Sequence, residues 1–391
     1  MEYVQERIAT LHEFGGSARD PARNDVADTT AAMAETAVVV PMTDREHESP
    51  AAERVLEELE SLTPAPAAVI VPVRADADSI GPVREWLESF SLPIQVLWCN
   101  SPAMESRLAA AGVPPGAGKG RDVWLALGPA TTAAEFVVVH DADARSYDAS
   151  HVHRLLAPLT MGFSFSKGYY ARIEDEQLYG RLFRLFYTPL VRTLADEHDE
   201  DILAYLDSFR YALAGEFAAR SDLARQLRAP RAWGLEVGTL GDAFDAAGFD
   251  GTAQVDLGRH EHDHRGVSGE TGLEGMSREV ASELLRVVEE RGVDPDYETL
   301  QERFLATGER LVGQYRADAA FNGLAYDPAS ERDQLARYAE SITSPGPDRR
   351  LPRWVDAPFD ATEVLKATQP WRTDQRSERR QLGRVDGSAQ D

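Results

Sequence analysis

Two aspartates, Asp141 and Asp143, are the residues of this chain that are best suited to metal chemistry. They follow His140 at the end of an apolar run at residues 136–139. On an extended segment alternate side chains point to opposite faces, so the two carboxylates do not chelate side by side. One of them can hold a divalent cation while the other contacts the sugar or ribose of a nucleotide. Carboxylate oxygens suit Mg²⁺ or Mn²⁺, which take further ligands from water and diphosphate. The alternative is a pair of solvated turn carboxylates.

Lysine is nearly absent from the chain, and two of the three lysines that remain flank the aspartate pair. Only Lys119, Lys167 and Lys366 are lysines among the 41 basic residues. Lys119 lies in a glycine-rich stretch at residues 116–120, where backbone amides can approach an anion and the ammonium is a compact charge for a diphosphate. This stretch lacks the spacing and the Ser/Thr of a P-loop, so it is a weak signal for an NTPase. The alternative is that this stretch is a turn before a helix and binds no ligand.

A histidine cluster suggests a second metal ligand. Three of the nine histidines are His260, His262 and His264, directly after an apolar stretch. We expect the imidazole of His262 to reach the cation, and a polar solvated loop is the alternative. A mixed carboxylate and imidazole shell favours Mn²⁺ somewhat more than an all-oxygen shell does.

Glu236 and Arg181 are the remaining candidates for ligand contacts. Glu236 interrupts an apolar helical pattern, and a buried carboxylate is costly unless it is paired. It therefore either forms a structural cap or ion pair, or contacts sugar hydroxyls. Arg181 follows a glycine at a predicted helix start, where a guanidinium can bind a phosphate or carboxylate in bidentate fashion. A plain surface arginine fits equally well. The single cysteine, Cys99, excludes internal disulfides and is expected in the core.

Alternating strands and helices are expected to position these residues. Near-continuous apolar strands separated by helices predict a parallel sheet that is covered on both faces. Ligands of such sheets bind at the carboxyl ends of the strands, so Glu46, Asp76 and the aspartate pair should share one rim. The predicted strands are 37–41, 68–73, 94–99 and 136–140, and the predicted helices are 51–62, 79–90 and 121–134.

The rest of the chain has a mixed pattern. Residues 1–36 are predicted to form a helix at 6–14 and then a polar loop, and residues from 344 onward an extended or disordered tail. Residues 37–160 and 161–343 are expected to form two halves, the second with a helical C-terminal part. In the second half we predict strands at 163–166 and 252–257 and helices at 176–196, 207–226, 233–247, 276–291, 296–318 and 329–342.

The net charge of −25 is spread along the whole chain. A cytosol rich in salt would screen the resulting self-repulsion, because the Debye length falls to roughly 3 Å at molar salt. A surface for a polycation is disfavoured because no acidic block is concentrated enough, and nucleic acid would be repelled. No apolar run approaches the roughly 20 residues of a membrane span. We therefore expect a soluble, cytoplasmic protein.

The ordered motifs resemble the glucosyl-3-phosphoglycerate synthase and mannosyl-3-phosphoglycerate synthase family over residues 37–340. The family consists of retaining glycosyltransferases of the GT-A fold. Asp44 and Arg45 stand where the family has Asn and Glu in its first turn. The similar segments are Val40-Pro41 with Glu46, Gly118-Lys119-Gly120, His140-Asp141-Ala142-Asp143, Ser166-Lys167-Gly168-Tyr169-Tyr170, Gly215-Glu216-Phe217-Ala218-Ala219, Trp233-Gly234-Leu235-Glu236-Val237-Gly238, and Val255-Asp256-Leu257-Gly258, which leads to His262.

The resemblance implies a fold, a reaction and a set of site residues. The fold is α/β of the GT-A type, with a Rossmann-like, mostly parallel sheet, helices on both faces and a helical C-terminal extension. The reaction is Mg²⁺- or Mn²⁺-dependent transfer of glucose or mannose from a UDP- or GDP-hexose to 3-phosphoglycerate or a similar small acidic acceptor. The implied residues are Glu236, Asp143 and Lys119 for catalysis, Pro41, Glu46, Asp76, Lys119, Asp141, Lys167 and Glu236 for the nucleotide sugar, Arg181 and His264 for the acceptor, and Asp143 and His262 for the metal.

Two other functions stay open on the residues alone. A sugar-phosphate nucleotidyltransferase could use the same sheet, metal and lysine but would release pyrophosphate from NTP. A non-catalytic protein that binds nucleotide sugar would show metal-dependent binding without turnover. For the transferase we expect a homodimer, no nucleic-acid or membrane partner, and a product that leads to a compatible solute.

Overall fold

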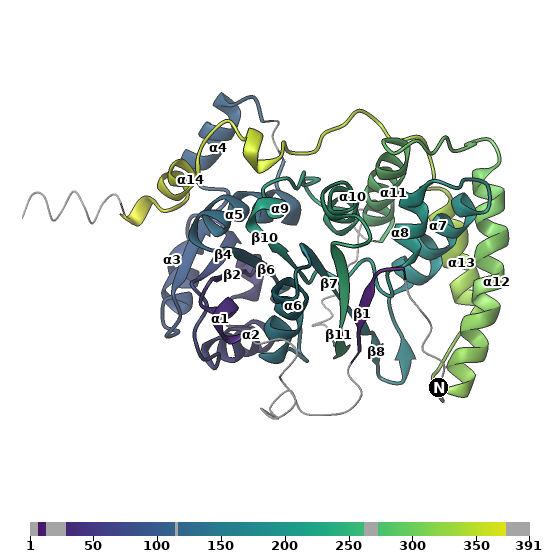
Figure 1. Ribbon diagram of the computed structural model, residues 1–391, viewed down its shortest axis with the longest axis horizontal. Helices are drawn as coiled ribbons and strands as arrows, with labels where there is room; N and C mark the ends of the chain where they lie inside the picture. Colours follow the sequence, from purple (N-terminus) through teal and green to yellow (C-terminus); the bar gives the residue numbers. More distant parts are fainter. Residues whose placement is uncertain (1–6, 13–28, 114–115, 262–272, 373–391) are drawn as a thin grey trace, which may run out of the picture.

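The structure, a computed structural model, describes residues 7–12, 29–113, 116–261 and 273–372. At its centre lies a mostly parallel sheet that has helices on both faces (Figure 1). This confirms the predicted α/β class. In spatial order its strands are β1 (Ala9–Leu11), β11 (Thr252–Arg259), β7 (Phe165–Ala171), β10 (Phe217–Arg220), β6 (Phe136–Val139), β2 (Thr36–Val39), β4 (Ala68–Arg74) and β3 (Met42–Thr43), and β5 (Ile94–Trp98) also pairs with β4.

Alternate residues of the strands face two separate apolar clusters. Ala37 and Val39 of β2 belong to one cluster, and Val38 and Val40 belong to the other. Because side chains alternate along a strand, a fully apolar strand is buried on both faces. Helices α4 (Pro102–Ala110), α5 (Lys119–Ala133), α9 (Ser221–Ala224), α10 (Leu235–Ala247) and α14 (Ala361–Thr368) contribute to the first cluster, and α1 (Thr30–Met33), α2 (Pro50–Glu60), α3 (Ile80–Leu87) and α6 (Ser150–Thr160) to the second.

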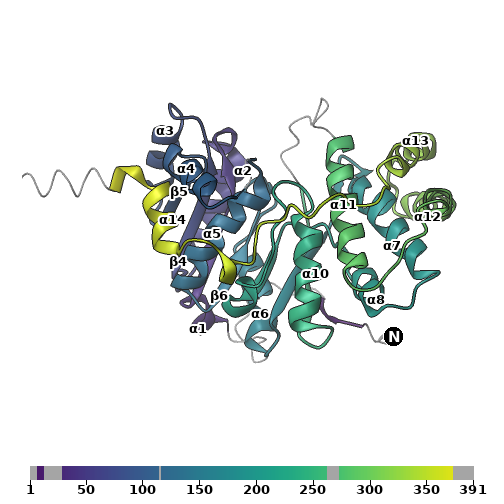
Figure 2. The ribbon, with the colours of Figure 1, turned by 90° about the horizontal axis from the view of Figure 1, so that it is seen from above.

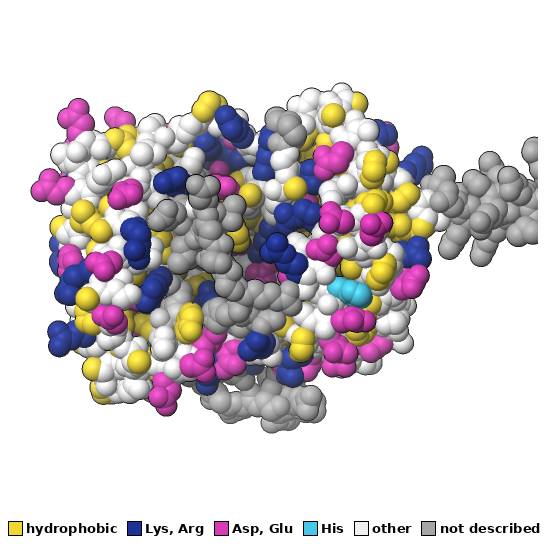
Figure 3. Space-filling model, turned by 180° about the vertical axis from the view of Figure 1, so that it is seen from behind, with side chains coloured by type: hydrophobic (Ala, Val, Ile, Leu, Met, Phe, Trp, Pro, Cys, Tyr) yellow, Lys and Arg dark blue, Asp and Glu magenta, His cyan; other side chains and the backbone are white. Residues whose placement is uncertain are grey.

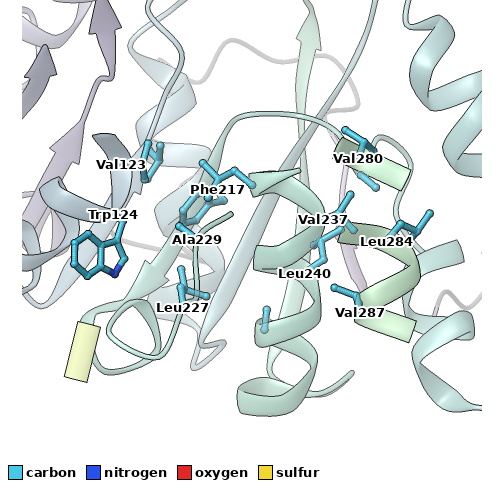
Figure 4. Packing of buried hydrophobic residues seen from close by; sticks show 14 of the residues in the cluster. Val123, Trp124, Phe217, Leu227, Ala229, Val237, Leu240, Val280, Leu284 and Val287 are labelled. Atoms are coloured by element: carbon cyan, nitrogen blue, oxygen red, sulfur yellow. The ribbon is translucent and has the colours of Figure 1, made fainter. Parts of the chain in front are cut away.

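The first cluster continues from the sheet into the C-terminal helices. Figure 4 shows Trp124 of α5, Phe217 of β10 and Leu240 of α10 among its side chains. Figure 2 shows the helical part beside the sheet. It consists of the π-helical turn η3 (Phe183–Tyr187), α7 (Thr188–Ala195), α8 (Asp201–Asp207), α11 (Leu273–Glu289), α12 (Leu300–Phe321) and α13 (Pro328–Ala339), with the hairpin of β8 (Ile173–Glu174) and β9 (Gln177–Leu178) nearby.

The helix predicted over residues 207–226 is wrong except near its end, where the short helix α9 forms. β10 lies directly before α9, and it runs antiparallel between β6 and β7. Phe217 and Ala219 of this strand are buried in the first cluster and Ala218 in the second. The short apolar segment is compatible with either helix or strand, and the vacant position between two strands decides in favour of the strand. The sheet therefore continues across the predicted boundary at residues 160 and 161.

Two further helix predictions are corrected in the same way. Within the predicted helix at 6–14, residues 9–11 form β1, which pairs in parallel with β11, and Gln254 Nε2 donates to Thr10 Oγ1 at 3.0 Å. The predicted long helix at 176–196 is divided into β9, η3 and α7. Gly180 separates β9 from η3 with a φ of 78°, a left-handed conformation that ends regular pairing there.

The predicted extended or disordered tail is also wrong for residues up to 372. After α13 the chain crosses the molecule and packs beside α4 and α5 (Figure 2), where η4 (Trp354–Asp356) and α14 form. Asp360 and Glu363 form a capping box at the start of α14. Trp124 Nε1 donates to Pro352 O at 2.8 Å, and Ser101 Oγ donates to Ala367 O at 2.7 Å. Distant partners thus order a segment whose local composition is polar.

Trp354→Ala should lower the free energy of unfolding by about 3–5 kcal/mol, because a buried aromatic side chain is removed. Trp354 is 9% exposed, and its ring centroid lies 4.9 Å from that of Trp124. Denaturant unfolding measures the change. The matched control is Phe321→Ala, because Phe321 is 90% exposed and its loss should change stability by less than about 0.5 kcal/mol. Equal unfolding midpoints for the two variants would contradict this packing role.

No helix among the described residues combines the length and the apolar character that a membrane crossing requires.

Candidate functional site

A pocket of about 260 Å³ opens at the carboxyl ends of the parallel strands. Four predicted site residues besides Lys119 reach it from the loops that follow β2 and β6, which is the rim that the sequence indicated. A cavity of about 610 Å³ lies beside α8, but it contains none of the predicted site residues. The smaller pocket is lined by Pro41, Met42, Thr43, Glu46, Arg74, Lys119, Asp122, Asp141, Ala142, Asp143 and Trp233.

Strand pairing determines where the aspartate pair leaves the sheet. His140 N donates to Val39 O at 3.0 Å, so pairing with β2 continues one residue past β6. Asp141 then lies against Gly215, which comes shortly before β10. A Cβ on residue 215 would lie 2.3 Å from Asp141 Oδ2. This space is free only because residue 215 is glycine.

Lys119, at the start of α5, joins two acidic residues that are distant in the sequence. Its Nζ lies 2.6 Å from Asp141 Oδ1 and 3.3 Å from Glu236 Oε1 in the first turn of α10. Burial disfavours the charged ammonium, but Asp141 and Glu236 outweigh it and raise the pKa of Lys119 above its ordinary value. The ammonium is therefore charged and held at the pocket. The half-buried carboxylate of Glu236 therefore has an ion-pair partner.

Asp143 lines the same pocket and is half-buried. Its carboxylate is a hard oxygen donor of the kind that Mg²⁺ and Mn²⁺ bind. Among residues 7–12, 29–113, 116–261 and 273–372, no group of three or more His, Cys, Asp or Glu side chains could hold a metal ion. The predicted ligand His262 and the predicted acceptor residue His264 lie outside the described residues. Both assignments stay predictions.

Lys167 lies below the site and does not line the pocket. It is buried in β7, where its Nζ donates to Ala214 O. Desolvation lowers the pKa of Lys167 to about 8, although Glu236 and Glu216 favour its charged form. The ammonium thus supports the turn that places Gly215 against Asp141.

Glu46 and Pro41 line the pocket, whereas Asp76 is exposed and does not. Thr43 N and Thr43 Oγ1 both donate to Glu46 Oε2 at 2.6 Å, in the capping box of the 3₁₀ turn η2 (Asp44–Glu46). This turn fixes the direction of the Glu46 carboxylate. Asp76 follows β4, but the chain turns there into α3 and leaves Arg74 as the residue of β4 that reaches the pocket.

Arg181 lies away from this pocket, in contact with α13. Its Nε donates to Glu331 Oε1 at 2.8 Å, and its Nη2 lies 3.4 Å from Ser330 Oγ. Arg184 Nη1 donates to the other oxygen of Glu331, also at 2.8 Å. One buried carboxylate is thus shared by two arginines, and the side chain of Arg181 remains 41% exposed.

Sequence reasoning missed two charged residues and one aromatic residue of the pocket: Arg74, Asp122 and Trp233. The sequence contained one signal for Arg74 and one for Asp122. Arg74 ends a parallel strand, and Asp122 lies one helical turn after Lys119 on α5. Trp233 is 40% exposed and comes directly before the left-handed Gly234 that begins α10. Its position in the loop before α10 carried no comparable signal.

Acidic and basic side chains interleave on the face shown in Figure 3.

Known proteins resemble the chain over most of its length, although no protein-family model matches it. A glucosyl-3-phosphoglycerate synthase of Methanococcoides burtonii is 33% identical over 380 residues, which cover 91% of this chain and 94% of that protein. The protein of the same name from Persephonella marina is 33% identical over 324 residues, covering 78% of this chain and 79% of the relative.

Solved structures that resemble the chain include complexes of a protein with the same name as these two relatives. A crystal structure of glucosyl-3-phosphoglycerate synthase from Mycobacterium tuberculosis with Mn²⁺, UDP and phosphoglyceric acid has a TM-score of 0.54 and 25% identity, covering 74% of this chain and 88% of that one. A complex of the same protein with Mn²⁺ and UDP-glucose has a TM-score of 0.53, 25% identity and the same coverage. A third complex contains Mg²⁺ and UDP.

Proposed function

Because the chain belongs to the glucosyl-3-phosphoglycerate synthase family, we propose that it transfers glucose from UDP-glucose to 3-phosphoglycerate. Membership makes it a hexosyltransferase, and the expected GT-A fold is confirmed by the likeness to the solved enzymes. The relatives bound to UDP-glucose favour glucose and uridine over the mannose and guanosine that the sequence left open.

One observation carries the proposal: a single pocket at the strand ends contains Lys119, Asp141 and Asp143. A nucleotide diphosphate sugar needs positive charge at its diphosphate and carboxylates for a metal and for hydroxyl groups. These are the groups that the pocket brings together. The predicted contacts of Pro41 and Glu46 with the nucleotide agree with their positions in its lining.

A divalent cation fits the chemistry of this pocket because Asp143 offers a hard oxygen donor beside the cationic Lys119. Asp143 would hold the ion, and His262 is the second ligand that we predict. When bound, the cation neutralises charge on the departing diphosphate.

Lys119 and Glu236 act on opposite sides of the bond that joins the donor glucose to the diphosphate. The charged Nζ of Lys119 stabilises the departing diphosphate, an effect typically worth a few kcal/mol in a preorganised site. Glu236, held at 3.3 Å from Lys119, orients hydroxyls of the donor glucose. Retention follows if the acceptor hydroxyl attacks from the face that the diphosphate leaves and its proton passes to a diphosphate oxygen. Asp141 holds Lys119 and contacts the donor sugar or the ribose.

We propose that Arg181, with His264, binds the phosphate or carboxylate of the acceptor. Arg181 is engaged by Glu331 but is partly exposed. Arg184 stays on Glu331, so that carboxylate remains paired if Arg181 turns towards an acceptor. The buried pair thereby avoids an uncompensated charge.

Incubation of the purified protein with UDP-glucose, 3-phosphoglycerate and Mg²⁺ or Mn²⁺ should release UDP and form a phosphorylated glucoside, as detected by mass spectrometry. GDP-glucose and GDP-mannose test the base and sugar. No product from any nucleotide sugar would overturn the proposal. Product from NTP plus sugar phosphate would identify a nucleotidyltransferase, and metal-dependent UDP binding without transfer would identify a binding protein.

We further propose that the product leads to a glucosylglycerate-type compatible solute in a salt-rich cytoplasm. The support is compositional, since the net charge is −25 and only three lysines remain. Transfer should persist in about molar KCl, where charge repulsion is screened. Loss of activity at that salt concentration would contradict this assignment. The expected homodimer stays a prediction.

Gly215→Ala should reduce transfer by about 10- to 100-fold, because the new methyl group would collide with the Asp141 carboxylate and displace it. Steady-state kinetics with UDP-glucose measure the loss. The matched control is Gly313→Ala, since a Cβ on Gly313 of α12 would meet nothing within 4 Å. Wild-type kinetics in Gly215→Ala would show that Asp141 needs no fixed position.

A further inference from the structure

A buried arginine joins α11 to the segment that crosses the molecule between α13 and η4. This crossing segment consists of residues 340–353. The side chain of Arg350 is only 3% exposed, and its Nη1 lies 3.6 Å from Glu283 Oε1 of α11. Its Nη2 donates to Glu290, directly after α11, and to Asp348 Oδ2 at 2.7 Å. The crossing segment is therefore held to α11 by a guanidinium among three carboxylates.

Glu283 lies directly against the start of α10. The two helices pack on each other, with Val237 of α10 and Leu284 of α11 in one apolar cluster (Figure 4). A Cβ on Gly238 would lie 3.0 Å from Glu283 Oε1, and a Cβ on Gly234 would lie 3.0 Å from Glu283 Cβ. Glycine at these two positions lets the helices approach this closely. The carboxylate oxygen nearest the buried arginine is thus also the one against α10.

Glu236 lies in the same turn of α10 but on its other side. Gly238 comes two residues later, and two residues advance a helix by about 200°. Gly238 therefore faces α11 while Glu236 faces Lys119, whose Nζ lies 3.3 Å from Glu236 Oε1. A shift of this turn relative to α11 would move the Glu236 carboxylate within the site.

The crossing segment also holds the stretch of chain that lies between α5 and α10. Leu351 N donates to Ala229 O at 2.9 Å. The next residue, Pro230, contacts both helices: a Cβ on Gly120 would collide with Pro230 O, and a Cβ on Gly238 would lie 3.2 Å from Pro230 Cδ. The crossing segment is thus connected by close contacts to the two helices that carry the lysine and the glutamate of the site.

We propose that Arg350 and Glu283 are positioning residues for the transfer, and that they hold the first turn of α10 so that Glu236 faces the donor glucose. This inference rests on the proposed role of Glu236. Neither positioning residue lines the pocket. Without Arg350, Glu283 would keep only Arg286, whose Nε lies 3.9 Å from its Oε2, and a poorly paired buried charge is costly. The carboxylate would then move and release the turn.

Arg350→Ala should weaken UDP-glucose binding by about tenfold and lower kcat by about tenfold or more, because a misplacement of about 1 Å can cost that much. The UDP affinity should change by less than about threefold, since UDP has no glucose for Glu236 to contact and Asp141 still holds Lys119 at 2.6 Å. Calorimetry with Mg²⁺ and steady-state kinetics measure these quantities. An equal loss of affinity for UDP and UDP-glucose, or no loss for either, would overturn the proposal.

A double variant separates positioning from general damage to the fold. In a Glu236→Ala background, Arg350→Ala should reduce UDP-glucose affinity and kcat by less than about twofold further, because Arg350 acts through the residue that is already missing. A purely structural role would reduce both quantities by the same factor with or without Glu236. That result would overturn the proposal.

A second buried arginine supplies the matched control. Arg291 follows α11, its side chain is 8% exposed, and its Nη2 lies 2.6 Å from Asp245 Oδ2. It therefore also joins α11 to α10, but near the end of α10 that is distant from Glu236. Arg291→Ala should keep the wild-type ratio of UDP-glucose to UDP affinity. A ratio that falls as far as in Arg350→Ala would show that any loosening of α10 has this effect, and would overturn the specific role of Arg350.

Binding and transfer are measured separately, so the two proposals can fail separately. Selective loss of UDP-glucose affinity in Arg350→Ala, in a protein that transfers no glucose, would support the positioning of Glu236 and refute the transferase. Glucose transfer by the wild type with an unchanged kcat in Arg350→Ala would support the transferase and refute the positioning.

Discussion

Asp143→Ala should abolish glucose transfer, with kcat/KM reduced by about 10³-fold or more, while the protein stays folded. Asp143 is half-buried in the pocket wall and offers the carboxylate that we assign to the cation. Its removal takes away a ligand but leaves the strands of the core intact. Steady-state kinetics measure the loss, and Mn²⁺ binding followed by electron paramagnetic resonance should weaken in parallel.

The matched control for this variant is Asp222→Ala on α9, where the side chain is 83% exposed and lies outside the pocket lining. It should keep wild-type transfer and Mn²⁺ affinity. Unchanged turnover in Asp143→Ala would refute the metal assignment. Weaker turnover with unchanged Mn²⁺ affinity would assign Asp143 to substrate rather than to the cation.

Lys119→Ala should lower kcat by about 10²- to 10³-fold, because it removes the fixed positive charge that faces the departing diphosphate. It should also lower the free energy of unfolding by about 1–3 kcal/mol, since Asp141 and Glu236 would lose their shared partner while still largely buried. Kinetics with saturating UDP-glucose and denaturant unfolding measure the two effects separately.

Two variants control for charge and for lysine loss as such. Lys119→Arg keeps the charge and should restore most of the stability, but its larger planar group fits the site poorly and should leave kcat well below that of the wild type. Lys366→Ala removes an exposed lysine of α14 and should change neither quantity. If Lys119→Ala retained wild-type kcat, the charge would have to be supplied elsewhere.

The sequence was sufficient wherever the signal is local. Near-continuous apolar segments predicted β2, β4, β5 and β6 at nearly their observed bounds, because such segments bury both faces of a parallel strand. The same logic placed the aspartate pair and Glu46 at the carboxyl rim. The helix predicted to begin at residue 121 is α5, which begins two residues earlier, at Lys119. These inferences depend on residues that are close together in the chain.

Tertiary contacts decided the elements whose local patterns fit more than one structure. β10 is a strand because a position between β6 and β7 is open to it, and β1 is a strand because it pairs with β11 at the edge of the sheet. Residues 343–372 are ordered because Trp354 and α14 bury apolar groups against α4 and α5. No window of neighbouring residues contains those partners.

The charged residues of the site also show which features the local sequence determines and which depend on tertiary contacts. Composition singled out Lys119, and an interrupted apolar pattern singled out Glu236. Because the two residues are 117 positions apart in the sequence, no local pattern shows that they are partners. Arg74 and Asp122 were overlooked because each is an ordinary charged residue until the fold buries one against the other at the pocket. Local patterns determine which side chains reach the rim. Which of them meet depends on how distant segments pack, since charge pairing acts over a few ångströms in space and takes no account of separation along the chain.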